Sequence, residues 1–270
     1  MGPWQMTLKS VRTKAKHSLQ MLKHFQHPLL VPLARLGWIT LDYCSFHVRK
    51  GEFEYDMLGR PLGGDHRILR EVLVDETYRP LMDLLPPRPV RLVEIGAHIG
   101  VFTIWLHRQR GISEAFCFEP DRDSFALCQF NLGREGSGTF RLHRQAIGGT
   151  TRESEIWIDQ AAHAKSSLLR NRENGAGQQS KVQVIALSEW LEQIEGDFDV
   201  LKMDCEGSEW EIIDATPAAL ARFSIIIAEI HDDPGQGRNI HDFASILGEN
   251  GFTTIRSDRL YIGQRNLATT

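Results

Sequence analysis

The sequence has few cysteines and no long hydrophobic run. Its four cysteines show no Cys-x-x-Cys spacing and mostly lie among apolar residues, so we expect reduced, buried thiols. No uninterrupted apolar stretch is long enough to span a bilayer, and the N-terminus lacks the apolar core and small-residue cleavage site of a signal peptide. These absences predict a cytoplasmic protein that is neither secreted nor membrane-spanning.

Acidic residues are nearly absent from the first 50 residues. Asp42 is the only acid there, against eight lysines and arginines, although the whole chain has a formal net charge of -4. We interpret residues 1–64 as a basic N-terminal extension and residues 65–270 as the main domain. Two roles stay open for the extension: packing on its own domain or a second copy in a homo-oligomer, or peripheral contact with anionic lipid or an acidic polymer. The net charge gives no reason to expect nucleic acid.

Short apolar runs alternate with helical patterns over most of the chain, whose 41% hydrophobic and 24% charged residues are typical of a globular protein. The runs read as strands lie at residues 90–95, 115–118, 139–147, 182–185, 200–203, 224–230, 252–256 and 260–265. This rhythm predicts an α/β fold with a doubly wound, mostly parallel sheet and one antiparallel edge. A further strand at 154–158 falls outside the rhythm, and residues 159–180 have the polar composition of a lid or a disordered loop.

A turn with two glycines follows the first apolar run. Glycines let a ligand approach the backbone closely, and the helix that begins after them offers N–H donors. The spacing from Gly96 to Gly100 lacks the middle glycine that makes room for a pyrophosphate, because Ala97 and His98 stand there. Glu94, just before the turn, is placed to hold an ammonium or sulfonium. The turn therefore predicts a cationic nucleoside without phosphate, for which S-adenosylmethionine is the first candidate.

Polar residues also follow the second, fourth and fifth buried strands. Glu119 lies 19 residues beyond Gly100, the spacing at which a carboxylate accepts hydrogen bonds from both ribose hydroxyls. Lys202 lies in a buried strand and needs a carboxylate partner. The side chains of Lys202, Asp204 and Glu206 share one side if the chain stays extended, and so do those of Glu229 and His231. A structural ion pair is the alternative role for Lys202. We expect Glu209 and Glu211 on the solvated face of the next helix.

Five motifs in order resemble the FkbM family of S-adenosylmethionine-dependent methyltransferases: Glu94-Ile-Gly-Ala-His-Ile-Gly, Phe118-Glu-Pro, Gln145-Ala-Ile-Gly, Leu201-Lys-Met-Asp-Cys-Glu-Gly-Ser-Glu and Ala228-Glu-Ile-His. The resemblance implies a class I methyltransferase (Rossmann-like) fold with a seven-stranded sheet, and O-methylation of a hydroxyl of a sugar, glycan or natural product. It implies that the cofactor contacts Glu94, Gly96, Ala97, His98, Gly100, Phe102, Glu119, Pro120, Gln145 and Ala146.

Methyl transfer to a hydroxyl requires alignment of the acceptor and removal of its proton. We expect Asp204 or His231 to be the base, Glu206 and Glu229 to bind or orient a small-molecule or carbohydrate acceptor, and Lys202 to set the local charge. In a variant, the carboxylates and the histidine bind a divalent cation that acidifies the hydroxyl. The alternatives are a nicotinamide-dependent oxidoreductase and a non-catalytic cofactor-binding protein that acts through its basic arm.

Overall fold

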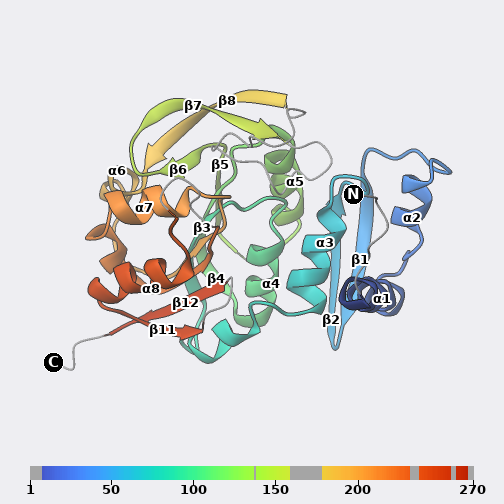
Figure 1. The fold of residues 1–270 in the computed structure, drawn as a ribbon, viewed down its shortest axis with the longest axis horizontal. Helices are drawn as coiled ribbons and strands as arrows, with labels where there is room; N and C mark the ends of the chain where they lie inside the picture. Colours follow the sequence, from blue (N-terminus) through green and yellow to red (C-terminus); the bar gives the residue numbers. More distant parts are fainter. Residues whose placement is uncertain (1–7, 137, 159–177, 232–236, 257–259, 267–270) are drawn as a thin grey trace. The chain divides into compact units, whose positions relative to one another are not determined.

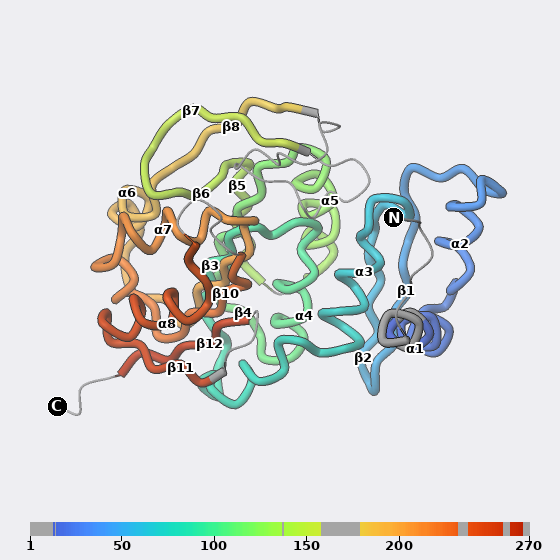
Figure 2. Tube along the Cα trace, in the orientation of Figure 1, coloured from blue at the N-terminus to red at the C-terminus, as the bar shows by residue number. Residues whose placement is uncertain are grey.

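The computed structural model describes residues 8–136, 138–158, 178–231, 237–256 and 260–266 (Figures 1 and 2). The chain forms two compact units, Met1–Thr77 and Tyr78–Thr270. The sequence-based division after residue 64 stays a prediction about the domains. In the structure, residues 65–77 belong to the first unit, because the helical turn at Arg70–Val74 packs against the first helix and first strand of that unit.

The first unit combines helices with a β-hairpin. Its elements are α1 (Leu8–His24), α2 (Leu30–Arg35), β1 (Cys44–Lys50), β2 (Phe53–Gly59), α3 (Asp65–Leu69) and the π-helical turn η1 (Arg70–Val74). The hairpin is antiparallel and pairs Cys44 with Gly59, and alternate residues such as Phe46 and Met57 are buried. Asp65 accepts the Arg60 backbone N–H at 2.7 Å and is ion-paired with its guanidinium at 3.0 Å, which fixes the chain after β2. The described part of the predicted N-terminal extension, residues 8–64, is therefore folded.

The second unit contains the seven-stranded sheet that the sequence predicted. Its strands are β3 (Val90–Ile95), β4 (Ile112–Phe118), β5 (Phe140–His143), β9 (Phe198–Met203), β10 (Phe223–Glu229), β11 (Phe252–Arg256) and β12 (Leu260–Arg265). Their order is β11-β12-β10-β9-β3-β4-β5. β12 is antiparallel to both its neighbours and lies one place in from the edge strand β11. The mostly parallel α/β fold is confirmed.

Helices cover both faces of this sheet, which makes it doubly wound (Figure 1). They are α4 (Val101–Arg110), α5 (Arg122–Leu132), α6 (Leu187–Glu192), α7 (Glu209–Ala215), α8 (Ile240–Glu249) and the short 3-10 turns η2 (Arg79–Asp83) and η4 (Ala219–Arg222). One core packs alternate strand residues, such as Val93 and Leu201, against α6, α7 and α8. The intervening residues of β3 and β9 therefore face the opposite layer, which contains α4.

The predicted third strand is two strands in the structure. β5 ends at His143, and β6 (Ala146–Gly148) joins β8 (Gln178–Ala186) and β7 (Arg152–Ile158) in a separate three-stranded sheet. Gln145 precedes β6, and its side chain donates to Gln183 of β8 at 2.8 Å. The strand expected outside the main rhythm is β7. The loop expected at 159–180 lies outside the described residues, except for its last three residues in β8.

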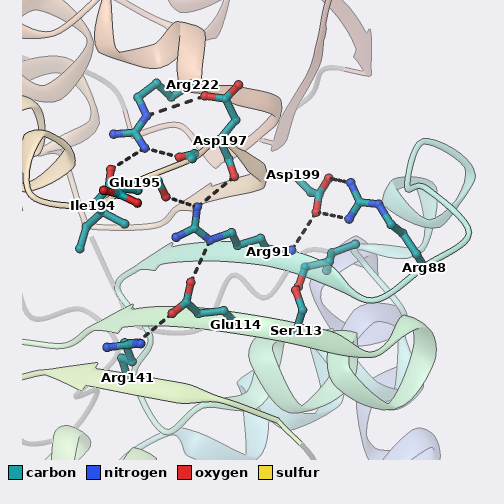
Figure 3. A network of polar contacts seen from close by, with 12 residues as sticks. Arg88, Arg91, Ser113, Glu114, Arg141, Ile194, Glu195, Asp197, Asp199 and Arg222 are labelled. Atoms are coloured by element: carbon teal, nitrogen blue, oxygen red, sulfur yellow. Dashed lines mark hydrogen bonds and ion pairs between the residues drawn. The ribbon is translucent and has the colours of Figure 1, made fainter.

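A polar network joins the amino ends of the parallel strands (Figure 3). Asp199 near the start of β9 accepts the Arg91 backbone N–H at 2.8 Å and both terminal nitrogens of Arg88 at 2.8 and 2.9 Å. The Arg91 side chain donates to Glu114 of β4 at 2.8 Å, and Glu114 also accepts from Arg141 of β5 at 2.9 Å. These bonds tie four neighbouring strands at the end opposite their carboxyl ends. No helix in the described part of the chain is long and apolar enough to cross a membrane.

Candidate functional site

The carboxyl ends of four parallel strands meet at one edge of the sheet. Ile95 of β3 is level with Met203 of β9 and with Phe118 of β4, and Ala228 of β10 is level with the same Met203. The residues that follow these strands therefore lie at one edge, where open α/β sheets bind ligands. They are the turn after β3, Glu119 and Pro120 after β4, Asp204 to Gly207 after β9, and Glu229 to His231 at the end of β10.

Gly96 is required because two chain segments touch at this edge. It has a φ of 81°, and a Cβ atom placed there would lie 1.9 Å from the carbonyl oxygen of Asp204. The Asp204 N–H donates to the Ile95 carbonyl at 3.1 Å and so continues the β3–β9 pairing into the turn. At the other end of the turn, Gly100 has a φ of 85° and begins α4. The two glycines have positive φ angles that other residues rarely adopt.

Lys202 lies at the centre of a buried charge network. It is level with Glu94 on the neighbouring strand, and its Nζ lies 3.5 Å from Glu94 Oε1, 3.4 Å from Asp204 Oδ2 and 3.0 Å from the Gly96 carbonyl oxygen. Burial would lower the Lys202 pKa, but the charges of Asp204 and Glu94 outweigh it and raise the pKa. The lysine is therefore a fixed cation that joins β3, its glycine turn and the end of β9.

Glu94 is almost fully buried, with both carboxylate oxygens engaged inside the protein. One oxygen pairs with Lys202, and the other accepts a hydrogen bond from the Thr103 hydroxyl of α4. Burial raises the Glu94 pKa, against the opposing influence of Lys202 and Thr103. A role in holding the turn follows directly from these bonds, whereas direct contact of Glu94 with a bound cation stays a prediction.

Glu119 bridges the glycine turn and α5. Its two carboxylate oxygens accept the backbone N–H groups of His98 and Asp121, each at 2.8 Å. Asp121 in turn accepts the Ser124 N–H at 3.0 Å and caps α5. Glu119 thus fixes the glycine turn relative to α5, and its contact with the ribose hydroxyls stays a prediction.

The other predicted cofactor residues are spread over the unit. Phe102 of α4 is buried, and its ring lies 4.8 Å from the ring of Tyr78. Ala97 is also buried in the glycine turn, whereas Ala146 lies in the small three-stranded sheet beside Gln145. These placements leave the cofactor roles of all four predicted residues as predictions.

Glu206, His231 and Glu209 form a second charged cluster. His231 Nδ1 lies 3.3 Å from Glu209 Oε1, and His231 Nε2 lies 3.5 Å from Glu206 Oε2. The His231 carbonyl accepts the Trp210 indole N–H at 2.7 Å, which fixes the backbone beside the ring. β9 ends at Met203 and Glu206 has a φ of 53°, so the chain does not stay extended as far as Glu206. Glu206 therefore pairs with His231, and Asp204 pairs with Lys202.

Glu209 and Glu206 raise the pKa of His231. Burial would lower its pKa, but the hydrogen bond and charge of Glu209 and the charge of Glu206 outweigh burial and raise the pKa to about 9. Burial also raises the pKa of Glu206 to about 7, with His231 acting in the opposite direction and Asp204, Glu209 and Glu229 adding to the rise. At neutral pH the histidine is therefore cationic, and Glu206 is present in both protonation states.

The expectation that Glu209 lies on a solvated face was wrong. Glu209 is fully buried, and it accepts the backbone N–H groups of Cys205 and Gly207, each at 2.8 Å, besides its contact with His231. The sequence held a signal: an acid in the first turn of a helix commonly bonds backward to unpaired N–H groups. Glu211, two residues further on, instead pairs with Arg152 at 2.9 Å.

Among the described residues, no group of three or more histidine, cysteine, aspartate or glutamate side chains is arranged to hold a metal ion. Of the four predicted metal ligands, Asp204, Glu206, Glu229 and His231, the first pairs with Lys202, whereas Glu206 and His231 pair with each other. The metal variant stays a prediction without a preformed ligand set.

Comparisons with known proteins bear on what this edge does. The chain is 23% identical over 265 residues to the AMB antimetabolite synthetase AmbE of Pseudomonas aeruginosa. The matched region covers 84% of this chain and 12% of AmbE. It is 23% identical over 165 residues to Methyltransferase 1 of Beauveria bassiana. This matched region covers 54% of this chain and 65% of that protein. The chain thus spans less than two thirds of either relative.

One similar solved structure is the magnesium protoporphyrin IX methyltransferase ChlM of Synechocystis PCC 6803 with bound SAM. Its sequence is 14% identical to this chain, and the two structures align with a TM-score of 0.45 over 75% of this chain and 82% of ChlM. The sequence profile of the methyltransferase FkbM domain matches residues 94–254. This match begins at Glu94, extends beyond the end of β10 and covers more than half of the chain. The chain therefore belongs to the FkbM methyltransferase family.

Proposed function

We propose that the protein is an S-adenosylmethionine-dependent O-methyltransferase that acts on a hydroxyl of a sugar, glycan or natural product. The observation that carries the proposal is the placement of two charged clusters, around Lys202 and around His231, beside the glycine turn at the carboxyl edge of the sheet. The name of the relative AmbE, an antimetabolite synthetase, supports a natural product as the acceptor class.

The donor set at this edge fits a cationic cofactor better than a phosphate. Carboxylates outnumber cations there: Glu94, Glu119, Asp204, Glu206 and Glu229 against Lys202 and His231. A sulfonium and an α-ammonium are attracted by such an excess of negative charge, which repels a diphosphate. We assign the turn from Gly96 to Gly100 and Glu119 to the cofactor. When bound, S-adenosylmethionine supplies a methyl group that is already activated by its positive sulfur.

Glu206 is the best matched base for the acceptor hydroxyl. A general base works best when its pKa lies near the operating pH, and the Glu206 pKa is about 7. His231 is held protonated by Glu209, so it is suited to orient Glu206 and to stabilise negative charge rather than to accept a proton. Asp204 is held by Lys202 and remains the alternative base; Glu229 is assigned to acceptor binding.

Methyl-labelled S-adenosylmethionine and a fractionated cell extract test the proposal. We expect label to enter a glycan or small-molecule fraction, and Glu206→Gln to lose most of this transfer while S-adenosylmethionine affinity stays within about threefold. Asp204→Asn tests the alternative base, and Glu211→Gln, which alters the neighbouring pair with Arg152, is the control.

Three outcomes would contradict parts of the proposal. Label in a protein or nucleic acid fraction would overturn the acceptor class. Normal transfer by Glu206→Gln would overturn the base. Tight NAD binding without any S-adenosylmethionine binding would favour the oxidoreductase.

Full activity in excess chelator would remove the metal variant, whereas loss on chelation and recovery with magnesium or manganese would support it.

A further inference from the structure

Exposed hydrophobic side chains are concentrated in the first unit. The described residues include ten large hydrophobic side chains that are exposed to solvent, and eight of them belong to this unit of 77 residues: Leu19, Leu22, Leu29, Leu36, Trp38, Leu41, Tyr43 and Leu62. Single exposed hydrophobic residues are normal in a folded protein, but a concentration of them marks a binding surface. Trp38 is the most exposed of these side chains, with 74% of its surface accessible.

Five of these exposed residues lie within one short stretch of chain, residues 29–43, which contains α2, and we call them the α2 surface: Leu29, Leu36, Trp38, Leu41 and Tyr43. Leu29 and Leu36 flank α2 as its cap residues, and the Trp38 N–H donates to the Leu33 carbonyl at 3.0 Å. Val31 and Ala34 of the same helix are buried. The segment is therefore folded on its inner side, and its large apolar side chains are directed outward from a defined backbone.

Basic residues accompany the exposed apolar ones. Lys16 and Lys23 are exposed on α1, near Leu19 and Leu22 along the helix, and Arg35 is exposed on α2. The first 50 residues contain a single acid, Asp42. A surface that combines tryptophan, tyrosine and leucine with basic residues is complementary to the headgroup region of an anionic bilayer, where aromatic rings with one polar atom are favoured.

We propose that the α2 surface binds peripherally to an anionic lipid bilayer, with Trp38 and Leu36 inserted at the headgroup level and with Arg35 of α2 and the exposed lysines of α1 attracted to the lipid phosphates. A bilayer fits this surface better than a protein partner because the apolar residues are spread over helix caps and loops, and a fluid surface demands no matching shape. The inference is independent of the proposed methyl transfer.

Sedimentation with vesicles tests this inference on the full chain. We expect the protein to pellet with vesicles of 70% phosphatidylcholine and 30% phosphatidylserine, and at least tenfold less with pure phosphatidylcholine. Trp38→Ser should reduce the partition coefficient at least fivefold, and Lys16→Glu with Lys23→Glu should reduce binding to the anionic vesicles. Phe130→Ser is the matched control, because Phe130 is 50% exposed but lies in the second unit.

Absence of binding to both kinds of vesicle would overturn the inference. So would equal loss of binding in Trp38→Ser and Phe130→Ser. Self-association of the wild-type chain in analytical ultracentrifugation, abolished by Trp38→Ser and unaffected by vesicles, would assign the α2 surface to a second copy instead. Circular dichroism of each variant is the control for folding. A loss of binding by a folded variant can then be attributed to the α2 surface.

Discussion

At the scale of single residues, the two charged clusters of the site are built differently. Lys202 is surrounded by Glu94, Asp204 and a carbonyl oxygen and has a structural part in joining β3 to β9. His231 lies between Glu206 and Glu209 and is more accessible. Removing one member of a buried charged cluster leaves its partner unpaired, which is costly. The first cluster therefore fixes the backbone, and the second is the one suited to proton transfer.

Replacement of Glu209 by glutamine tests how His231 is held. The variant removes the negative charge beside Nδ1, so the His231 pKa should fall from about 9 by at least one unit, toward its ordinary value. NMR titration of the histidine ring carbons measures the pKa directly. Glu211→Gln is the control and should leave the His231 pKa unchanged. An unchanged pKa in Glu209→Gln would show that Glu209 has no such role.

The positions of the site residues in the fold could be predicted from the sequence, but the directions of some of their side chains could not. The strand ends gave the positions of Glu119, Asp204 and His231, because a buried apolar run fixes where a strand stops. The direction of Glu206 could not be predicted, since it depends on a positive φ that only the folded turn imposes. Glu209 was misassigned because its helix begins with a buried first turn, and sequence spacing alone does not show which face of so short a helix is covered.

At the scale of elements, the contact between the β3 turn and the end of β9 depends on Gly96. Gly96→Ala adds a Cβ atom 1.9 Å from the Asp204 carbonyl oxygen at a φ of 81°, so we expect about 3 kcal/mol of destabilisation. Gly251→Ala is a matched control, because Gly251 has a φ of 85° and no atom near its added Cβ; it should cost about 1 kcal/mol. Urea unfolding measures both. Equal losses would contradict the close approach.

The amino ends of the strands provide a second test that is separate from the site. Asp199→Asn weakens the bonds to Arg88 and to the Arg91 backbone. The variant should lower the free energy of unfolding by about 1–2 kcal/mol. The bond to Arg88 should contribute less of this loss, because the Arg88 side chain is exposed to solvent. Asp197→Asn, at an exposed carboxylate, should change it by less than about 0.5 kcal/mol. S-adenosylmethionine affinity should be unaffected in both, and a tenfold loss would show that the two ends of the sheet are coupled.

Element positions could be predicted from apolar periodicity where each element has its own pattern. The closing strands were placed at 252–256 and 260–265, and these are β11 and β12. The pattern failed at β5 and β6, because only Arg144 and Gln145 separate the two strands and only the partner strands show that the chain changes sheets.

At the scale of the whole molecule, Glu206 and His231 predict a bell-shaped pH dependence of methyl transfer. The rate should rise with pH as Glu206 loses its proton near pH 7, and fall again as His231 loses its proton near pH 9. Label transfer measured from pH 5 to 10 gives the profile. Glu206→Gln should remove the rising limb from whatever activity remains. A rate that is flat between pH 6 and 8 would contradict the assignment of Glu206.

The most direct test of the account is calorimetric titration of the wild-type chain with S-adenosylmethionine and S-adenosylhomocysteine, with Gly96→Ala titrated beside it. The account predicts one binding site for either compound and at least tenfold weaker binding by Gly96→Ala, because the added methyl group separates the glycine turn from Asp204. A wild-type protein that is folded by circular dichroism but binds neither compound would contradict the claim that the turn from Gly96 to Gly100 holds the methyl donor.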